Sequence, residues 1–170
     1  LVDVTEGEFA GWQGWQSDAF EQRAGPFYEK RQADGTMLTA FRAEPRHMNG
    51  AGFMHGGCLM TFADSAIFTI ARDALGDSHG VTLTLTGDFL DPARVGQLIE
   101  ATGEVVRTGG KTIFVAGIVR ADGNPVLRFD GIIRARVRDL QEAFDRARAQ
   151  FGYAAPYHPV YPIKVNQDRY

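Results

Sequence analysis

A glycine-rich loop that leads into an apolar segment carries the side chains best suited to chemistry. The stretch reads NGAGFMHGGCLMTFAD from Asn49 to Asp64. If a helix begins at Gly56 and Gly57, their backbone N–H groups have no acceptor within the helix and lie at the positive end of its dipole. Such groups can stabilise the negative charge that develops on a carbonyl oxygen during acyl transfer. The stretch thus combines an oxyanion donor with a carboxylate, Asp64, that can act as base or nucleophile.

Each of these residues also has a structural interpretation. Asn49 is followed by glycine, as in many turns, although its amide offers both a donor and an acceptor. His55 either caps the helix or exchanges a proton with a substrate. Asp64 is either an ion-paired structural acid or a group retained for chemistry, and both interpretations stay open at this point.

Two other motifs fail on their context. GDSHG at 76–80 fits the G-x-S-x-G pattern of serine hydrolases, but it follows a helix and precedes a strand, the reverse of what that pattern needs. GKT at 110–112 resembles the end of a phosphate-binding loop, but Val105 stands where the first glycine belongs and no helix follows. We interpret both as turns.

The remaining reactive side chains favour neither a metal nor a thiol nucleophile. Cys58 lies in the first helical turn, where a thiolate is favoured, but beside Leu59 it fits a small core residue better. His47, His55 and Asp64 lack the regular spacing of metal ligands. We therefore predict no metal site and no cofactor.

The segment 57–75 must be the helix that positions the loop, and Gly76 stands where a C-cap glycine belongs. At about 100° per residue, one face is apolar throughout and suits a sheet that covers it. That face holds Leu59, Phe62, Ala63, Ala66, Ile67, Ile70 and Ala74. A second side is mostly apolar as well and contains Gly57, Met60, Thr61, Asp64, Phe68 and Ala71. We expect this second side to meet another protein surface, because a solvent-exposed side would carry Lys and Glu.

Strand-like segments surround this helix in the sequence. Two precede it, at 26–31 and 35–44, and four follow it, at 81–90, 97–107, 111–121 and 125–138. The short turns between them indicate an antiparallel arrangement. We predict an α+β domain of the hot-dog type, in which an antiparallel sheet of about six strands wraps around one long central helix.

The two ends of the chain fall outside this pattern. Residues 4–23 have Phe9, Trp12 and Trp15 at helix-like spacing, so we predict an N-terminal helical extension over 1–25. The hot-dog domain spans 26–138. A short amphipathic helix at 139–150 and a proline-rich tail at 151–170 make up the C-terminal part, 139–170.

Composition excludes several classes of protein. The chain has 170 residues and a net charge of −3, which argues against a nucleic-acid partner. No apolar run is long enough to cross a membrane, so we expect no membrane partner. The single cysteine forbids an internal disulfide and favours a reducing compartment, and we expect a cytoplasmic protein.

Asn49, His55, Gly56 and Asp64, followed by Thr82 on the next strand, resemble the hot-dog thioesterases of the phenylacetic-acid-degradation type (PaaI-like). Their pattern is an Asn, HGG six residues later, and an Asp eight residues beyond the first of these glycines. The stretch FLDPARVGQLIEATGEVVRTGGK is also similar to that family's strand–turn–strand signature. The resemblance covers about 26–138.

The resemblance implies an acyl-CoA thioesterase that forms a homodimer or a tetramer, with each active site shared between two subunits. Asp64 would activate water or attack the thioester, and the Gly56 N–H would hold its oxygen opposite Asn49 of a second copy. Thr82 would position the water, and His55 would support the loop. Gly57, Phe53 and Phe68 would contact the substrate, as would Phe62, and Lys111 would meet a phosphate of coenzyme A.

Two other functions compete with this one. A non-catalytic protein of the same fold would bind or sense acyl-CoA and release no product. A hydratase or dehydratase would need a His–Asp or His–Glu pair beside the acyl β-carbon, and His55 would be its candidate. The spacing of HGG and Asp64 favours the thioesterase, while the identity of the acyl group stays open.

Overall fold

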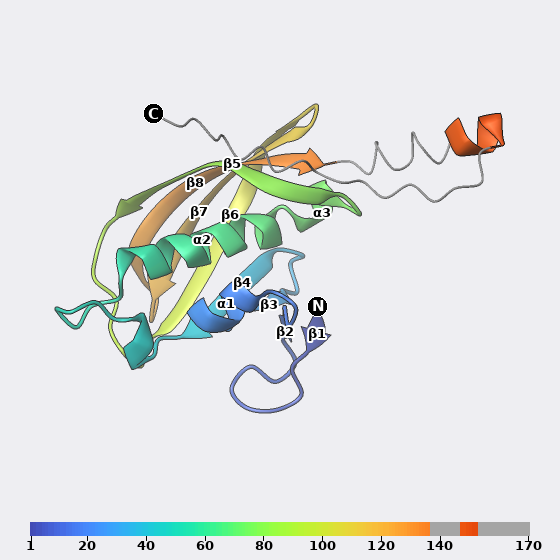
Figure 1. Ribbon diagram of the computed structural model, residues 1–170. Helices are drawn as coiled ribbons and strands as arrows, with labels where there is room; N and C mark the ends of the chain where they lie inside the picture. The colour runs from blue at the N-terminus through green and yellow to red at the C-terminus, as the bar shows by residue number, and fades with distance from the viewer. Residues whose placement is uncertain (137–146, 153–170) are drawn as a thin grey trace, which may run out of the picture.

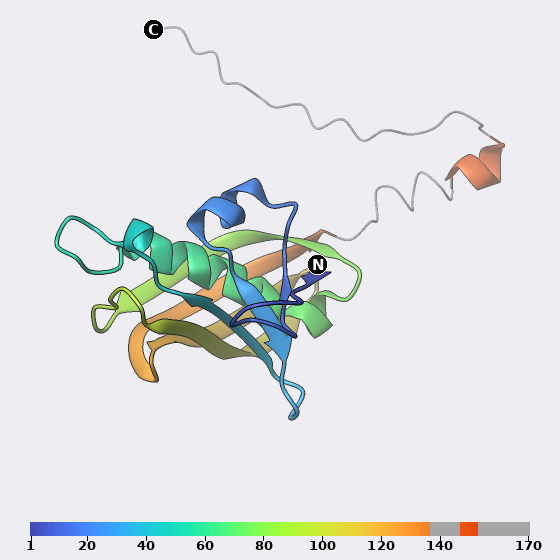
Figure 2. The same ribbon diagram turned by 90° about the horizontal axis from the view of Figure 1, so that it is seen from below.

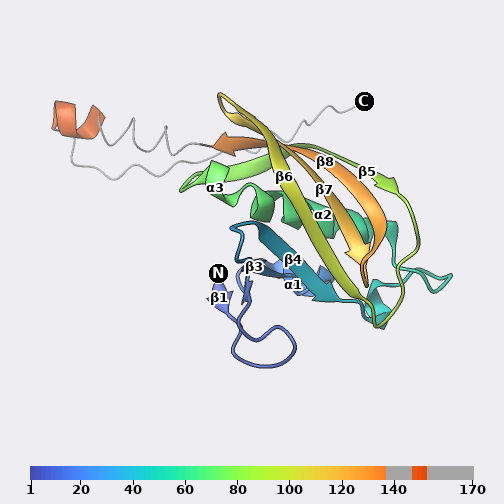
Figure 3. The same ribbon diagram turned by 180° about the vertical axis from the view of Figure 1, so that it is seen from behind.

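The long helix α2 lies in the hollow of a curved antiparallel sheet, as the computed structural model shows (Figures 1 and 3). The structure describes residues 1–136 and 147–152. In chain order the elements are β1 (Val2–Asp3), β2 (Gln13–Gly14), α1 (Ala19–Ala24), β3 (Tyr28–Arg31), β4 (Met37–Arg42), the 3₁₀ helix η1 (Pro45–His47), α2 (Gly56–Ile70), α3 (Arg72–Leu75), β5 (His79–Phe89), β6 (Leu98–Gly109), β7 (Thr112–Ala121) and β8 (Asn124–Arg136). The eight strands form one sheet in the order β1-β2-β3-β4-β6-β7-β8-β5.

One face of α2 forms the centre of the hydrophobic core. Phe62 is fully buried and packs edge-to-face on Phe27 and Phe41, with ring centroids 5.1 and 4.8 Å apart. Ile67 lies against Gly131 of β8, where an added Cβ would approach Ile67 to 2.9 Å. The missing side chain lets helix and sheet approach closely, so the core is filled without a gap.

Strand β5 packs beside α2 and forms the end of the sheet, where it pairs with β8. Two glycines of β5 make room for side chains of the helix. A Cβ added at Gly80 would approach Phe68 to 2.8 Å, and one added at Gly87 would approach Met60 to 2.8 Å. The register of β5 shifts between Thr82 and Thr84, as in a β-bulge.

The predicted hot-dog fold is confirmed, with differences in detail. The sheet has eight strands rather than about six, because two short strands of two residues each, β1 and β2, are added at one end. The predicted helix over 57–75 is interrupted at Ala71, whose ψ of 4° leaves the helical region. This turn buries Ala71, which we had assigned to the second side, and exposes Ala74, which we had assigned to the core. Gly76 is the C-cap of α3, with φ +53°.

The predicted helix over 4–23 is wrong for most of its length. Gly7 and Gly11 adopt φ values of +79° and +83°, which no right-handed helix contains. The segment instead folds back on itself, and the Val4 N–H donates to the Trp12 carbonyl at 2.8 Å. Only α1 is helical, and Asp18 caps it by accepting from the N–H groups of Phe20 and Glu21. The predicted helix over 139–150 and the tail over 151–170 lie largely outside the described residues.

The N-terminal segment is tied to the domain and lies beside α2 (Figure 2). Phe9 stacks on Tyr28 with ring centroids 4.3 Å apart.

The buried carboxylate of Glu29 on β3 accepts from the Thr69 hydroxyl at 2.9 Å and pairs with Arg72. In the described part of the chain, no helix is long and apolar enough to cross a membrane.

Candidate active site

Asp64 and Thr82, which are distant in sequence, meet between α2 and β5. The Thr82 hydroxyl donates to Oδ1 of Asp64 at 2.6 Å, and both residues are half-buried. Because a carboxylate in a partly buried place costs free energy unless it is bonded, this hydrogen bond stabilises Asp64 and fixes its orientation. The second carboxylate oxygen is left for another partner.

The two glycines at the start of α2, Gly56 and Gly57, differ in whether their N–H groups are already hydrogen-bonded. His55 is the N-cap, and its Nδ1 accepts from the Gly57 N–H at 2.9 Å. The Gly57 donor is therefore engaged by the cap. Gly56 precedes it at the start of the helix, and none of the hydrogen bonds recorded within residues 1–136 uses its N–H. Gly56 is thus the better oxyanion donor of the pair.

Asn49 organises the loop that precedes α2. Its Oδ1 accepts from the N–H groups of Ala51 and Phe53 at 2.9 and 3.2 Å, and its backbone N–H donates to the Phe53 carbonyl at 2.7 Å. The side-chain carbonyl oxygen of Asn49 therefore has the structural role of holding the turn. The side-chain NH₂ group can still donate to a ligand.

Phe89 is a site residue that sequence reasoning missed. Its ring lies where a side chain at position 56 would stand, with Cζ 3.1 Å from an added Cβ, and the residue is 57% exposed. Leu90 beside it is 53% exposed. The strand segment VTLTLTGDFL ends on these two apolar residues, but its alternation gave no sign that they would meet the start of α2.

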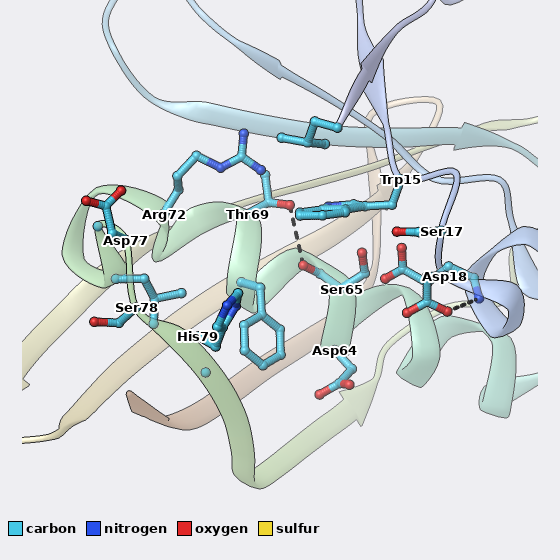
Figure 4. A pocket seen from close by; sticks show the side chains of 16 residues that line it. Trp15, Ser17, Asp18, Asp64, Ser65, Thr69, Arg72, Asp77, Ser78 and His79 are labelled. Carbon is cyan, nitrogen blue, oxygen red and sulfur yellow. Dashed lines mark hydrogen bonds between the residues drawn. The ribbon is translucent and has the colours of Figure 1, made fainter. Parts of the chain in front are cut away.

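A hollow of about 700 Å³ opens beside Asp64 (Figure 4). Its walls come from α2, from the turn between α3 and β5, and from the N-terminal segment, which contributes Trp15. Phe68, which we predict to contact substrate, lines the hollow. A second hollow of about 350 Å³ also reaches Asp64, between α1 and Met60. Asp64 can therefore meet a ligand from this side.

The other predicted substrate contacts lie elsewhere. Phe62 is fully buried in the core, so its prediction as a pocket residue is wrong. Phe53 lies in the loop before α2 under the guanidinium of Arg94, 4.6 Å from the ring centroid. Lys111 lies in the turn between β6 and β7, away from the start of α2 (Figure 1).

Burial raises the pKa values of two groups on or near α2, Glu21 and Cys58. Burial raises the pKa of Glu21, and the carboxylates of Asp18, Glu29 and Asp64 raise it further, while a hydrogen bond from Ser65 lowers it. Burial raises the pKa of the Cys58 thiol to about 11, so Cys58 is no thiolate nucleophile. Among residues 1–136 and 147–152, no group of three or more His, Cys, Asp or Glu side chains could hold a metal ion.

Asp64 and Gly56 of one chain stand far apart on the same helix. Eight residues separate them, and at a rise of 1.5 Å per residue this places them about 12 Å apart along the axis. A thioester carbonyl must lie within hydrogen-bonding distance of its oxyanion donor and close to the attacking group. This separation is long for two groups that act directly on one carbonyl.

Comparison with known proteins finds similarity to thioesterases. Residues 51–127 match the family model of the thioesterase superfamily. The curated protein PA0474 of Pseudomonas aeruginosa, whose name proposes an esterase, is 29% identical over 109 residues, which are 64% of this chain and 81% of that one. A mutant of the phenylacetic acid degradation protein PaaI from Thermus thermophilus is 28% identical with a TM-score of 0.60, over 69% of this chain and 98% of that one. The BH2602 protein of Bacillus halodurans, solved with CoA, is 25% identical with a TM-score of 0.59, over 63% and 72%.

A short segment of the chain is also similar to arginine decarboxylases. Arginine decarboxylase 1B of Nicotiana tabacum is 51% identical over 45 residues, which are 26% of this chain and 6% of that enzyme. Because the chain spans so little of the decarboxylase, this likeness concerns one segment and supplies no activity. The long match is the informative one: over residues 51–127 the chain is similar to the thioesterase superfamily, and its sheet wrapped around α2 is the fold of its PaaI neighbours.

Proposed function

We propose that the protein is an acyl-CoA thioesterase with Asp64 as its general base or nucleophile. The observation that carries this proposal is the hydrogen-bonded pair of Asp64 and Thr82, which lies on the side of α2 away from the core and borders two hollows. Within the described residues, Asp64 takes part in no recorded ion pair. Its second carboxylate oxygen can accept the proton of a water molecule. The CoA found with the BH2602 protein supports the class of substrate.

The reaction consumes one water and releases a free acid and the thiol of coenzyme A. The Gly56 N–H stabilises the charge on the thioester oxygen while water, or Asp64 itself, attacks the carbonyl carbon. Asp64 takes the proton of the water, the C–S bond breaks, and the departing sulfur receives a proton. Thr82 holds the carboxylate in the orientation for this transfer through its 2.6 Å hydrogen bond.

We infer that the site is shared between two copies of the chain. The separation of about 12 Å along α2 supports a site in which Gly56 of one copy works with Asp64 of another. The end strand β5 supports such an assembly, because its 11 residues have an edge that pairs with no other strand of the described residues and can pair with a second copy. Leu83 and Phe89 of that strand are 52% and 57% exposed. We expect a dimer or a larger assembly at micromolar concentration, and a monomer by light scattering would contradict the shared site.

A panel of acyl-CoA substrates tests the activity through the release of free thiol. We expect hydrolysis by the wild type and turnover near background for Asp64→Ala. Saturable acyl-CoA binding without release of CoA would instead identify a binding or sensing protein. Unchanged turnover in Asp64→Ala would overturn the mechanism.

Two variants at one position test the oxyanion donor. Gly56→Pro removes the N–H at the first helical position, where proline is tolerated, and should lower turnover by about a hundredfold or more. Gly56→Ala keeps the N–H and adds only a methyl group against Phe89, so it controls for crowding at that ring. Equal losses in both variants would show that crowding, not the donor, matters.

A further inference from the structure

The hollow beside Asp64 has a wall that residues outside the matched segment 51–127 supply. Trp15, Asp18 and Glu21 face it from the N-terminal segment, and α2 contributes Asp64 and Phe68 on the other side. In Figure 4, Trp15 lies across Ser65 and Thr69, and Asp18 stands next to it. The hydrogen bond between Ser65 and Glu21 joins this wall to α2. An acyl group in this hollow therefore touches the N-terminal segment.

The charge of the hollow is unevenly distributed. Its lining contains four carboxylates, those of Asp18, Glu21, Asp64 and Asp77. The cation in the lining, Arg72, already pairs with the buried carboxylate of Glu29, whose side chain is 4% exposed. His79 is the remaining titratable side chain, and Leu1 also lines the hollow. Because Arg72 is paired with Glu29, the other charged side chains of the lining are carboxylates, and they disfavour a negatively charged ligand group.

Three of these carboxylates also line the second hollow that reaches Asp64. The hollow of about 350 Å³ between α1 and Met60 is also lined by Asp18, Glu21 and Asp64. A substrate that reaches Asp64 from either hollow therefore passes Glu21. Trp15 and Phe68 offer apolar surface beside these charges in the larger hollow.

We propose that the N-terminal segment selects the acyl group: Trp15 contacts its apolar body, and Glu21 with Asp18 rejects acyl groups that end in a carboxylate. The substrates are then uncharged acyl thioesters, and dicarboxylic acyl thioesters are excluded. The inference rests on the proposed function for the identity of the ligand, but its selectivity can be measured by binding alone.

The test compares hexanoyl-CoA with glutaryl-CoA at pH 8. The wild type should prefer hexanoyl-CoA in kcat/KM by about tenfold or more, and Glu21→Gln should reduce this ratio by about fivefold. Glu6→Gln is the matched control, because Glu6 is exposed on the same segment and lines neither hollow, and it should keep the wild-type ratio. An unchanged ratio in Glu21→Gln would overturn the inference.

Two thioethers that cannot be hydrolysed separate this inference from the proposed function. S-hexyl-CoA and S-(4-carboxybutyl)-CoA should show the same preference in Kd, even if the protein releases no CoA. Discrimination in binding without turnover would refute the thioesterase and keep the selectivity. Turnover without discrimination would refute the selectivity and keep the thioesterase.

Fluorescence tests whether the ligand reaches Trp15. The chain has 2 Trp residues, and Trp12 packs on Phe9 at 5.5 Å instead of lining the hollow. Addition of S-hexyl-CoA should change the emission of the Trp12→Phe protein, in which Trp15 is the remaining tryptophan. The Trp15→Phe protein should show no change. The opposite result would remove the N-terminal segment from the site.

Discussion

The two sides of α2 differ in how completely they are filled. On the core side, Phe62, Ala63 and Ala66 are fully buried and touch aromatic and aliphatic side chains of the sheet. On the side that faces β5, Met60, Asp64 and Phe68 are half-buried and meet Gly87, Thr82 and Gly80. The core side is apolar apart from Thr69, whose hydroxyl donates to the buried carboxylate of Glu29, whereas the β5 side combines a carboxylate and a hydroxyl with hollows.

This difference separates residues that hold the fold from residues kept for chemistry. A buried apolar side chain lowers the free energy of the folded state, and its removal leaves a cavity. A half-buried carboxylate contributes little to stability, because its desolvation offsets its hydrogen bond. Substitutions on the two sides should therefore have opposite effects on stability and on turnover.

Asp64→Asn should have the largest effect on activity. An amide can neither take the proton of water nor attack a carbonyl, so kcat should fall by about a hundredfold or more. The melting temperature should stay the same or rise, because the charge is removed while the shape is kept. Large unfolding with preserved specific activity would make Asp64 a structural residue.

Phe62→Ala should show the reverse. The fully buried ring contacts Phe27 and Phe41, and its loss should reduce the free energy of unfolding by about 3–5 kcal/mol. Specific activity of the folded fraction should change far less than in Asp64→Asn. Denaturant unfolding followed by turnover of the same sample measures both quantities.

Thr82→Val should have an intermediate effect on activity. Valine has nearly the same shape but removes the hydroxyl that donates to Asp64 at 2.6 Å. The carboxylate then loses its fixed orientation, and kcat should fall by about tenfold, with a smaller change in KM. Thr82→Ser, which retains the hydroxyl, is the control and should recover most of kcat.

Cys58→Ala should have the smallest effect. Burial raises the pKa of this thiol to about 11, so it is protonated at pH 8 and should react slowly with iodoacetamide. Turnover should stay within about twofold of the wild type, because a small partly buried side chain is replaced by another. A large loss of activity on alkylation or substitution would assign a role to the thiol.

The sequence predicted the hot-dog fold because alternation and helical periodicity are local signals. The strands after α2 and the core side of α2 follow from such patterns, and Gly76 predicted the end of α3 correctly. The N-terminal segment failed the same reasoning. Phe9, Trp12 and Trp15 have helical spacing, but Gly7 and Gly11 with positive φ turn the chain back. Phe9 stacks on Tyr28 of β3 instead, and Trp15 lines the hollow beside Asp64.

The candidate site was predictable in part. Spacing along the chain indicated Asp64 and the start of α2 as candidates, and the structure brings Asp64 together with Thr82. Phe89 and Glu21 could not be found this way, because each reaches the site through tertiary packing. Phe62 was misassigned to the substrate pocket although its helical position already placed it on the core side, where it is fully buried.

The central claim is that Gly56 of one copy and Asp64 of another form one active site. Co-expression of Gly56→Pro and Asp64→Asn chains tests it, because each homodimer lacks one essential group in both sites. Mixed dimers contain one intact site, so the mixture should recover about a quarter of the wild-type activity. As a control, Asp64→Asn mixed with a chain that carries both substitutions should recover none. Activity no greater than that of the two separate variants would contradict the shared site, because it would mean that both groups act within one chain.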